Sequence, residues 1–162
     1  MNIFKKILLV IMVFTMAMFI TGCGKEEKKD LNIEGTLEEI MTKVYEKLPE
    51  DNRPMMLGNI EVTEENVEYY LGSSDIKYTE ALASEPGIGS IAHSVVLLRV
   101  EDGEDIEKVK TTIKEKVDPR KWLCVGVERE DLIVKNKGNL VILIMVEDEK
   151  TRTTLEEGFD NL

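Results

Sequence analysis

The chain has 162 residues and a formal net charge of −11 at pH 7, with 32 acidic and 21 basic side chains. Nucleic acid and anionic lipid headgroups repel a surface this acidic, so nucleic acid is excluded as a predicted partner. One histidine and two cysteines are too few for an ordinary zinc site. Neither a metal nor a cofactor is predicted.

The first segment in chain order, over 1–22, is predicted to be a signal peptide. Lys5 and Lys6 precede an apolar run over 7–20 that only Thr15 interrupts. A helix needs about 20 residues to cross the hydrocarbon core of a bilayer, so this run is too short for a membrane span. A positive start before a short apolar core is typical of a secretory signal.

The residues Ile20-Thr21-Gly22-Cys23 end this run and resemble the bacterial lipobox, whose cysteine is lipidated before cleavage in front of it. We therefore predict lipidated Cys23 and a charged, flexible tether over 23–30, followed by one domain over 31–162. Two or more acyl chains hold a protein stably at a membrane. This predicts a lipid-anchored protein on the extracytoplasmic face of the cell membrane; an ordinary signal peptide with a chance cysteine, or an uncleaved anchor, is the alternative.

Two helices are predicted at the start of the domain, over 36–48 and 64–71. Thr36 and Glu39 have the spacing of a capping box, and apolar residues follow at helical intervals. Thr63 is the predicted cap of the second helix, and Gly72 is placed to end it in a left-handed conformation.

Four strands and two more helices are predicted in the rest of the domain. They are strands over 76–84 and 91–100, a helix over 104–117, strands over 132–134 and 140–146, and a last helix capped by Asp148. These elements predict an α+β fold in which a four-stranded, mainly antiparallel sheet packs with helices.

The segments 95–102 and 141–148 are similar, because each is a strand with apolar residues on both faces that ends in Glu-Asp before a helix. They suggest two β-β-α units with the strand order 1-2-4-3. Both unit helices are then expected on one sheet face, with the two N-terminal helices, or another molecule, on the other. Convergent strand-to-helix sequence is the alternative to duplication.

Arg120, Lys121 and Trp122 place two cations beside the only tryptophan. Such a step suits an anionic or carbohydrate ligand, or a partner surface. A helix end with a tryptophan anchored in the core is the alternative. His93 is a further possible contact residue.

His93, Ser94 and Cys124 are the candidates for catalysis. A Ser–His or Cys–His pair needs contact and a third group that orients the imidazole, and Ser94 lacks the glycine-flanked elbow of hydrolases. We therefore assign no catalytic residue, and a hydrolase or ligand-processing enzyme that uses these residues is the alternative. Cys124 follows Leu123 and is predicted to be a buried thiol.

Several segments carry a resemblance across nearly the whole mature chain. They are Glu-Ile-Met-x-Lys-Val-Tyr over 39–45, Tyr-Tyr-Leu-Gly over 69–72, Ser-Glu-Pro over 84–86, the strand over 91–100, Asp-Pro-Arg-Lys-Trp over 118–122 and Gly-Asn-Leu-Val-Ile-Leu-Ile over 138–144. With the lipobox they resemble Gram-positive lipoproteins grouped as domain of unknown function 4358. That family implies no activity and no site. The predicted role is a non-enzymatic envelope binding or accessory module that contacts an envelope protein or a small ligand.

Overall fold

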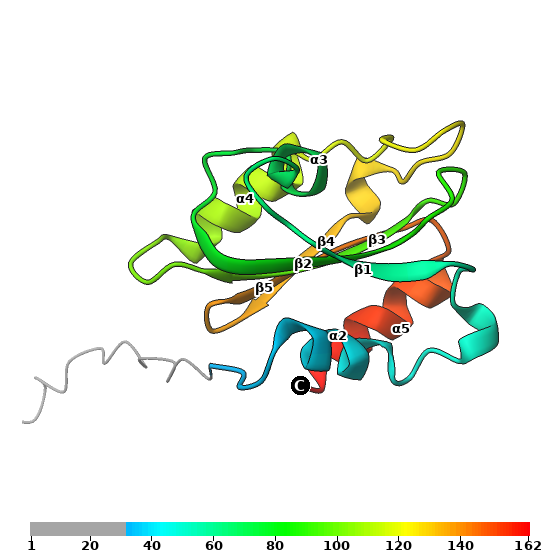
Figure 1. Ribbon diagram of the computed structural model, residues 1–162, viewed down its shortest axis with the longest axis horizontal. Helices are drawn as coiled ribbons and strands as arrows, with labels where there is room; N and C mark the ends of the chain where they lie inside the picture. The colour runs from blue at the N-terminus through cyan, green and yellow to red at the C-terminus, as the bar shows by residue number, and fades with distance from the viewer. Residues whose placement is uncertain (1–31) are drawn as a thin grey trace, which may run out of the picture. The chain divides into compact units, whose positions relative to one another are not determined.

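The computed structural model describes residues 32–162, which form a five-stranded antiparallel sheet between two layers of helices (Figure 1). The strands are β1 (Leu57–Glu61), β2 (Tyr78–Pro86), β3 (His93–Val100), β4 (Ile133–Lys137) and β5 (Leu140–Val146). The helices are α2 (Leu37–Tyr45), α3 (Val67–Leu71), α4 (Ile106–Lys116) and α5 (Glu149–Asp160), with 3₁₀ turns η1 (Glu50–Asn52) and η2 (Arg129–Asp131). The predicted α+β class is confirmed.

Two of the predicted segments, the signal peptide over 1–22 and the lipidated Cys23 with its tether over 23–30, lie outside the described residues. None of the helices within residues 32–162 is long and apolar enough to cross a membrane.

The sheet has the order β1-β2-β3-β5-β4, and every neighbouring pair is antiparallel. The four predicted strands occur in their expected order, as β2-β3-β5-β4. The predicted number of strands is wrong, because β1 adds a fifth at the edge. The sequence of β1 shows no alternation, and four of its five residues are exposed. Main-chain pairing with β2, rather than side-chain burial, therefore defines this strand.

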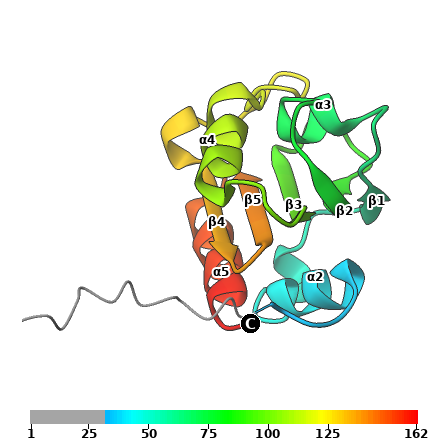
Figure 2. The same cartoon turned by 90° about the vertical axis from the view of Figure 1, so that its left-hand side faces the viewer.

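The central strands β3 and β5 are buried on both faces, because a helical layer covers each (Figure 2). Alternate residues of each strand point to opposite sides of a sheet. Val96 and Leu143 pair and pack with α3 and α4, whereas Val95 and Ile144 pair and pack with α2 and α5. We call these sides the α3–α4 face and the α2–α5 face. The chain covers both faces of its own sheet.

The expectation that both unit helices share one face is wrong, because α4 and α5 lie on opposite faces (Figure 2). The strand register gives the reason. The similar segments align Val95 with Val141, but Val95 pairs with Ile144, three residues from Val141. An odd step reverses the face. In a true repeat, a rotation would superpose one β-β-α unit on the other, and aligned residues would lie on the same face of the sheet. Val95 and Val141 lie on opposite faces, so the two similar segments are not a structural repeat.

Both N-terminal helices are present, with shorter bounds than predicted. The capping box of α2 is confirmed, since Glu39 N donates to Thr36 Oγ1 at 3.2 Å and Thr36 N donates to Glu39 Oε2 at 3.1 Å. The prediction that Thr63 caps α3 is wrong, because Asn66 holds that position and its Oδ1 accepts from Thr63 N at 2.8 Å. Gly72 ends α3 with φ of 79°, as predicted.

Two glycines set how closely the helices of each layer approach. A Cβ on Gly72 would lie 2.3 Å from the backbone of Lys116 at the end of α4. A Cβ on Gly158 would lie 2.1 Å from Val44 O in α2. Because glycine has no side chain, the backbone of α3 can contact the end of α4, and the backbone of α5 can contact α2.

Candidate functional site

The predicted contact residues Arg120, Lys121 and Trp122 lie in the loop that joins α4 to β4, and they separate in space. Arg120 remains in solvent, where its guanidinium pairs with Glu128. Its backbone N donates to Asp118 Oδ1 at 2.9 Å, which turns the chain after α4. Lys121 and Trp122 point into the protein, and their side chains are buried.

Glu85, at the end of β2, is the centre of a buried polar cluster on the α3–α4 face. Its Oε2 accepts a hydrogen bond from Lys121 Nζ at 2.8 Å. Its Oε1 accepts from Trp122 Nε1 at 3.1 Å and from the Tyr69 hydroxyl at 3.0 Å. Lys121 Nζ also donates to Ser94 Oγ at 3.3 Å. The Lys121 and Glu85 side chains are only 3% and 8% exposed, so water does little to screen the charge of either.

Three aromatic rings surround the ammonium of Lys121. Its Nζ lies 4.1 Å from the ring centroid of Tyr69, 4.6 Å from that of Tyr70 and 5.3 Å from that of Trp122. A cation within about 6 Å of an aromatic face is attracted by the ring quadrupole. We call Tyr69, Tyr70, Glu85, Lys121 and Trp122 the Glu85–Lys121 cluster.

The cluster changes the proton affinity of its members. Burial lowers the pKa of the Lys121 ammonium, and the hydrogen bond and the charge of Glu85 oppose that shift. Burial and the neighbouring Glu85 carboxylate both raise the pKa of the Tyr69 hydroxyl. Tyr69 therefore stays protonated as a donor over a wider alkaline range than a free tyrosine does.

Sequence reasoning found Lys121 and Trp122 but missed Glu85, Tyr69 and Tyr70. The missed residues lie on β2 and α3, and only the tertiary packing brings them to the loop after α4. One local signal was available, because Glu85 directly follows the small or apolar residues Ala81 to Ser84 at the end of a strand. A buried charge requires a partner, so Glu85 could have been marked as half of an ion pair.

His93 and Ser94 do not form a catalytic pair. They are neighbours on β3 and therefore point to opposite faces of the sheet. Ser94 faces Lys121, whereas His93 Nε2 is hydrogen-bonded to the Tyr45 hydroxyl at 2.7 Å on the α2–α5 face. Burial lowers the pKa of His93 to about 4, so its imidazole is neutral near pH 7.

Cys124 is exposed, so the prediction of a buried thiol is wrong. Leu123 beside it is 72% exposed, which means that apolar neighbours did not signal a core segment. The backbone of Cys124 has φ of 64°, a left-handed conformation that is uncommon for a residue with a side chain.

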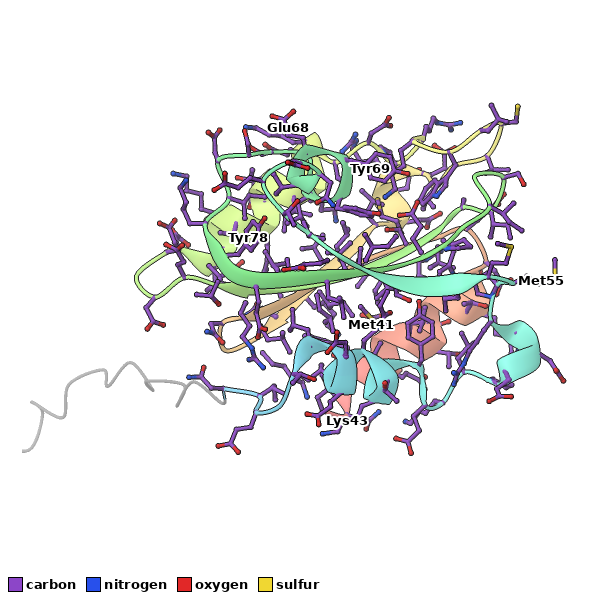
Figure 3. The ribbon with its side chains drawn as sticks, in the orientation of Figure 1. Met41, Lys43, Met55, Glu68, Tyr69 and Tyr78 are labelled. Carbon is purple, nitrogen blue, oxygen red and sulfur yellow. The ribbon has the colours of Figure 1, made fainter. Side chains whose placement is uncertain are left out.

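Three large apolar side chains are exposed on loops at the end of the sheet where β1 begins and β2 ends. Met55, Met56 and Leu123 are 73%, 71% and 72% exposed, and Figure 3 shows Met55 projecting beyond β1. Backbone hydrogen bonds tie these loops to the β2–β3 connection, since Gly87 N donates to Met56 O at 3.0 Å and Leu123 N donates to Gly89 O at 2.7 Å. We call Met55, Met56 and Leu123 the apolar tip.

A hollow of about 690 Å³ lies next to the start of β2, and neither the Glu85–Lys121 cluster nor the apolar tip contributes to its lining. It is lined by Glu61, Glu64, Glu101, Lys77 and Tyr78, among others. Trp122 takes no part in this lining, so the hollow does not serve a ligand at the predicted tryptophan site. Among residues 32–162, no group of three or more His, Cys, Asp or Glu side chains is arranged to hold a metal ion.

No protein-family model, no curated protein and no solved structure matches the chain. The resemblance to the Gram-positive lipoprotein family stays a prediction.

Proposed function

We propose that this protein is a lipid-anchored, extracytoplasmic binding module that contacts another envelope protein through its apolar tip. The tip is the observation that carries the proposal. Three large apolar side chains stand in solvent on two separate loops at the same end of the sheet. Exposed apolar groups gathered in one place commonly mark interaction sites.

The backbone beneath the tip supports this proposal. Met56 and Cys124 are the only residues other than glycine with positive φ within the described part of the chain, at 58° and 64°. Met56 belongs to the tip, and Cys124 adjoins Leu123 in it. A left-handed conformation costs a residue with a Cβ on the order of 1 kcal/mol, and such strain gathers at functional sites. Both left-handed residues thus lie in or next to the tip.

The position of the tip suits a protein partner. Gly35, near the start of the described residues, accepts a hydrogen bond from Arg99 at the far end of β3. The tip lies beyond the opposite end of that strand, next to the β2–β3 connection (Figure 1). The chain therefore enters the domain at one end and presents the tip at the other, so the tip stands apart from the end of the domain to which the tether connects.

The expected occupant is an apolar recess on another envelope protein. Anionic headgroups would repel the net charge of −11, which argues against insertion of the tip into the bilayer. A second copy is a poor match, because side chains that project from loops complement a recess rather than another projection. The enzyme alternative has no support from the geometry, since His93 contacts neither Ser94 nor Cys124.

The contact is tested by site-specific photo-crosslinking in intact cells that produce the full chain. A photoreactive residue in place of Leu123 should give one discrete protein adduct, and Met55→Ser with Met56→Ser should reduce that adduct at least about tenfold, since each lost apolar contact weakens binding. The same probe at Lys108, which is exposed on α4, is the matched control. A yield no higher than at Lys108, an adduct with lipid, or an adduct with a second copy would each refute the proposed contact.

The anchor is tested separately. Cys23→Ala removes the only thiol that the lipobox offers for acylation. The variant should therefore be lost from the membrane fraction, or it should accumulate with its signal peptide uncleaved. Cys124→Ala is the control and should leave the membrane fraction unchanged. Mature Cys23→Ala protein that still fractionates with membranes would show that the anchor is not a lipid on Cys23.

A further inference from the structure

We infer that Tyr69, Tyr70, Trp122 and Glu85 form a binding site for an alkylammonium group, and that Lys121 of the same chain occupies this site. The inference is independent of the apolar tip and of the lipid anchor. It assigns a ligand chemistry to the Glu85–Lys121 cluster: a primary or methylated ammonium at the end of an aliphatic stem.

The walls of the site supply what an ammonium requires. One carboxylate oxygen accepts a hydrogen bond from Nζ at 2.8 Å, and the Ser94 hydroxyl accepts a second at 3.3 Å. Three ring faces lie within 4.1 to 5.3 Å of the nitrogen. Aromatic faces with a carboxylate favour a compact cation over a neutral group, because both the ring quadrupoles and the negative charge attract it.

Most residues of the site belong to helices and strands, and not to the loop that carries Lys121. Tyr69 and Tyr70 stand on α3, Glu85 on β2 and Ser94 on β3, whereas Lys121 reaches the site from a loop. Trp122 Nε1 and the Tyr69 hydroxyl both donate to Glu85 Oε1, which holds the carboxylate in place without using Oε2. Oε2 is thus kept for the cation.

The site has one thin side. Tyr70, Glu85 and Trp122 are buried, but Tyr69 is 45% exposed while its ring lies against Nζ. Tyr69 is therefore the partly exposed member of the site, and we infer that a rotation of this side chain admits an external ammonium. An external ammonium then competes with Lys121 for one position, and the chain's own lysine acts as a built-in competitor.

The test removes the competitor and supplies its atoms separately. Lys121→Ala deletes three carbons and the nitrogen, and n-propylammonium restores them. The full chain in detergent carries a single tryptophan, Trp122, so its fluorescence reports directly on the site. Propylammonium chloride should change this fluorescence in a saturable manner and raise the Tm by about 4 °C at ten times its Kd. Sodium chloride at equal ionic strength and n-propanol should do neither.

Matched variants make the outcome decisive. Lys121→Met fills the site with an uncharged stem and should not respond, and Lys121→Ala with Glu85→Gln should lose most of the response. If Lys121→Ala is unfolded without amine, propylammonium should restore protease resistance and the native Trp122 emission. The inference is overturned if propylammonium acts no more strongly than sodium chloride, if n-propanol acts equally well, or if an unfolded Lys121→Ala chain is not rescued.

Discussion

Replacing Lys121 with methionine is expected to lower the free energy of unfolding by about 3–5 kcal/mol, because it leaves the Glu85 carboxylate without its charged partner. The two side chains are 3% and 8% exposed, so solvent cannot take the place of the lost ammonium. Methionine keeps the aliphatic stem and most of the packing. The loss therefore measures the charge rather than a cavity, and chemical denaturation followed by Trp122 fluorescence provides the measurement.

The neighbouring Arg120 offers a matched control for this prediction. Its guanidinium pairs with Glu128, but both side chains are mostly in solvent. Exposed ion pairs of this kind contribute at most about 1 kcal/mol, so Arg120→Met should have a small effect. Similar losses in the Lys121 and Arg120 variants would mean that the burial of the Glu85–Lys121 pair has no energetic weight.

A double variant separates the pair from the rest of the cluster. Glu85→Gln keeps an acceptor for Trp122 and Tyr69 while removing the negative charge. Adding it to Lys121→Met should recover about 1 kcal/mol or more, because no unpaired charge then remains. A double variant that is less stable than Lys121→Met alone would contradict this account of the destabilisation.

Acidification from pH 6.5 to pH 4 is expected to remove about 3 kcal/mol of stability through His93 alone. Burial lowers the pKa of His93 in the folded protein from 6.5 to about 4. Between these two values the unfolded chain binds a proton that the folded chain does not bind. The contribution of His93 is therefore fully present above pH 6.5 and is lost as the pH falls through this window.

The His93→Gln variant isolates that contribution. Glutamine can accept a hydrogen bond from the Tyr45 hydroxyl, which His93 Nε2 contacts at 2.7 Å, but it does not titrate. Carboxylates are common to both proteins and cancel in the difference between their unfolding free energies. The unfolding free energy of the wild type minus that of His93→Gln should fall by about 3 kcal/mol between pH 6.5 and pH 4. Parallel stability curves for the two proteins would show that His93 is not protected from protonation by the fold.

Local sequence patterns were sufficient for most of the secondary structure. Thr36 and Glu39 marked the start of α2, Gly72 marked the end of α3, and Asp148 marked the start of α5 because caps act within one turn of their own helix. The apolar runs of β3 and β5 likewise predicted two central strands covered on both faces.

Features that depend on distant partners could not be read from such patterns. The edge strand β1 has no core face of its own, so pairing with β2 is what makes it a strand. The faces covered by α4 and α5 depend on the β3–β5 register, in which one residue of shift would exchange the two sides. Neither the strand pairing nor that register is encoded in a window of neighbouring residues.

Local sequence patterns were thus enough to predict the α+β class and four of the strands, because hydrophobic periodicity and helix caps act over neighbouring residues. The lipid anchor at Cys23 also rests on a local motif, and it stays a prediction because that residue lies outside the described part of the chain. Long-range packing was needed to join Lys121 to Glu85 across 36 residues and to gather Met55, Met56 and Leu123 at one end of the sheet. A buried charge and an exposed apolar group acquire their meaning from what surrounds them, and those surroundings come from other parts of the chain.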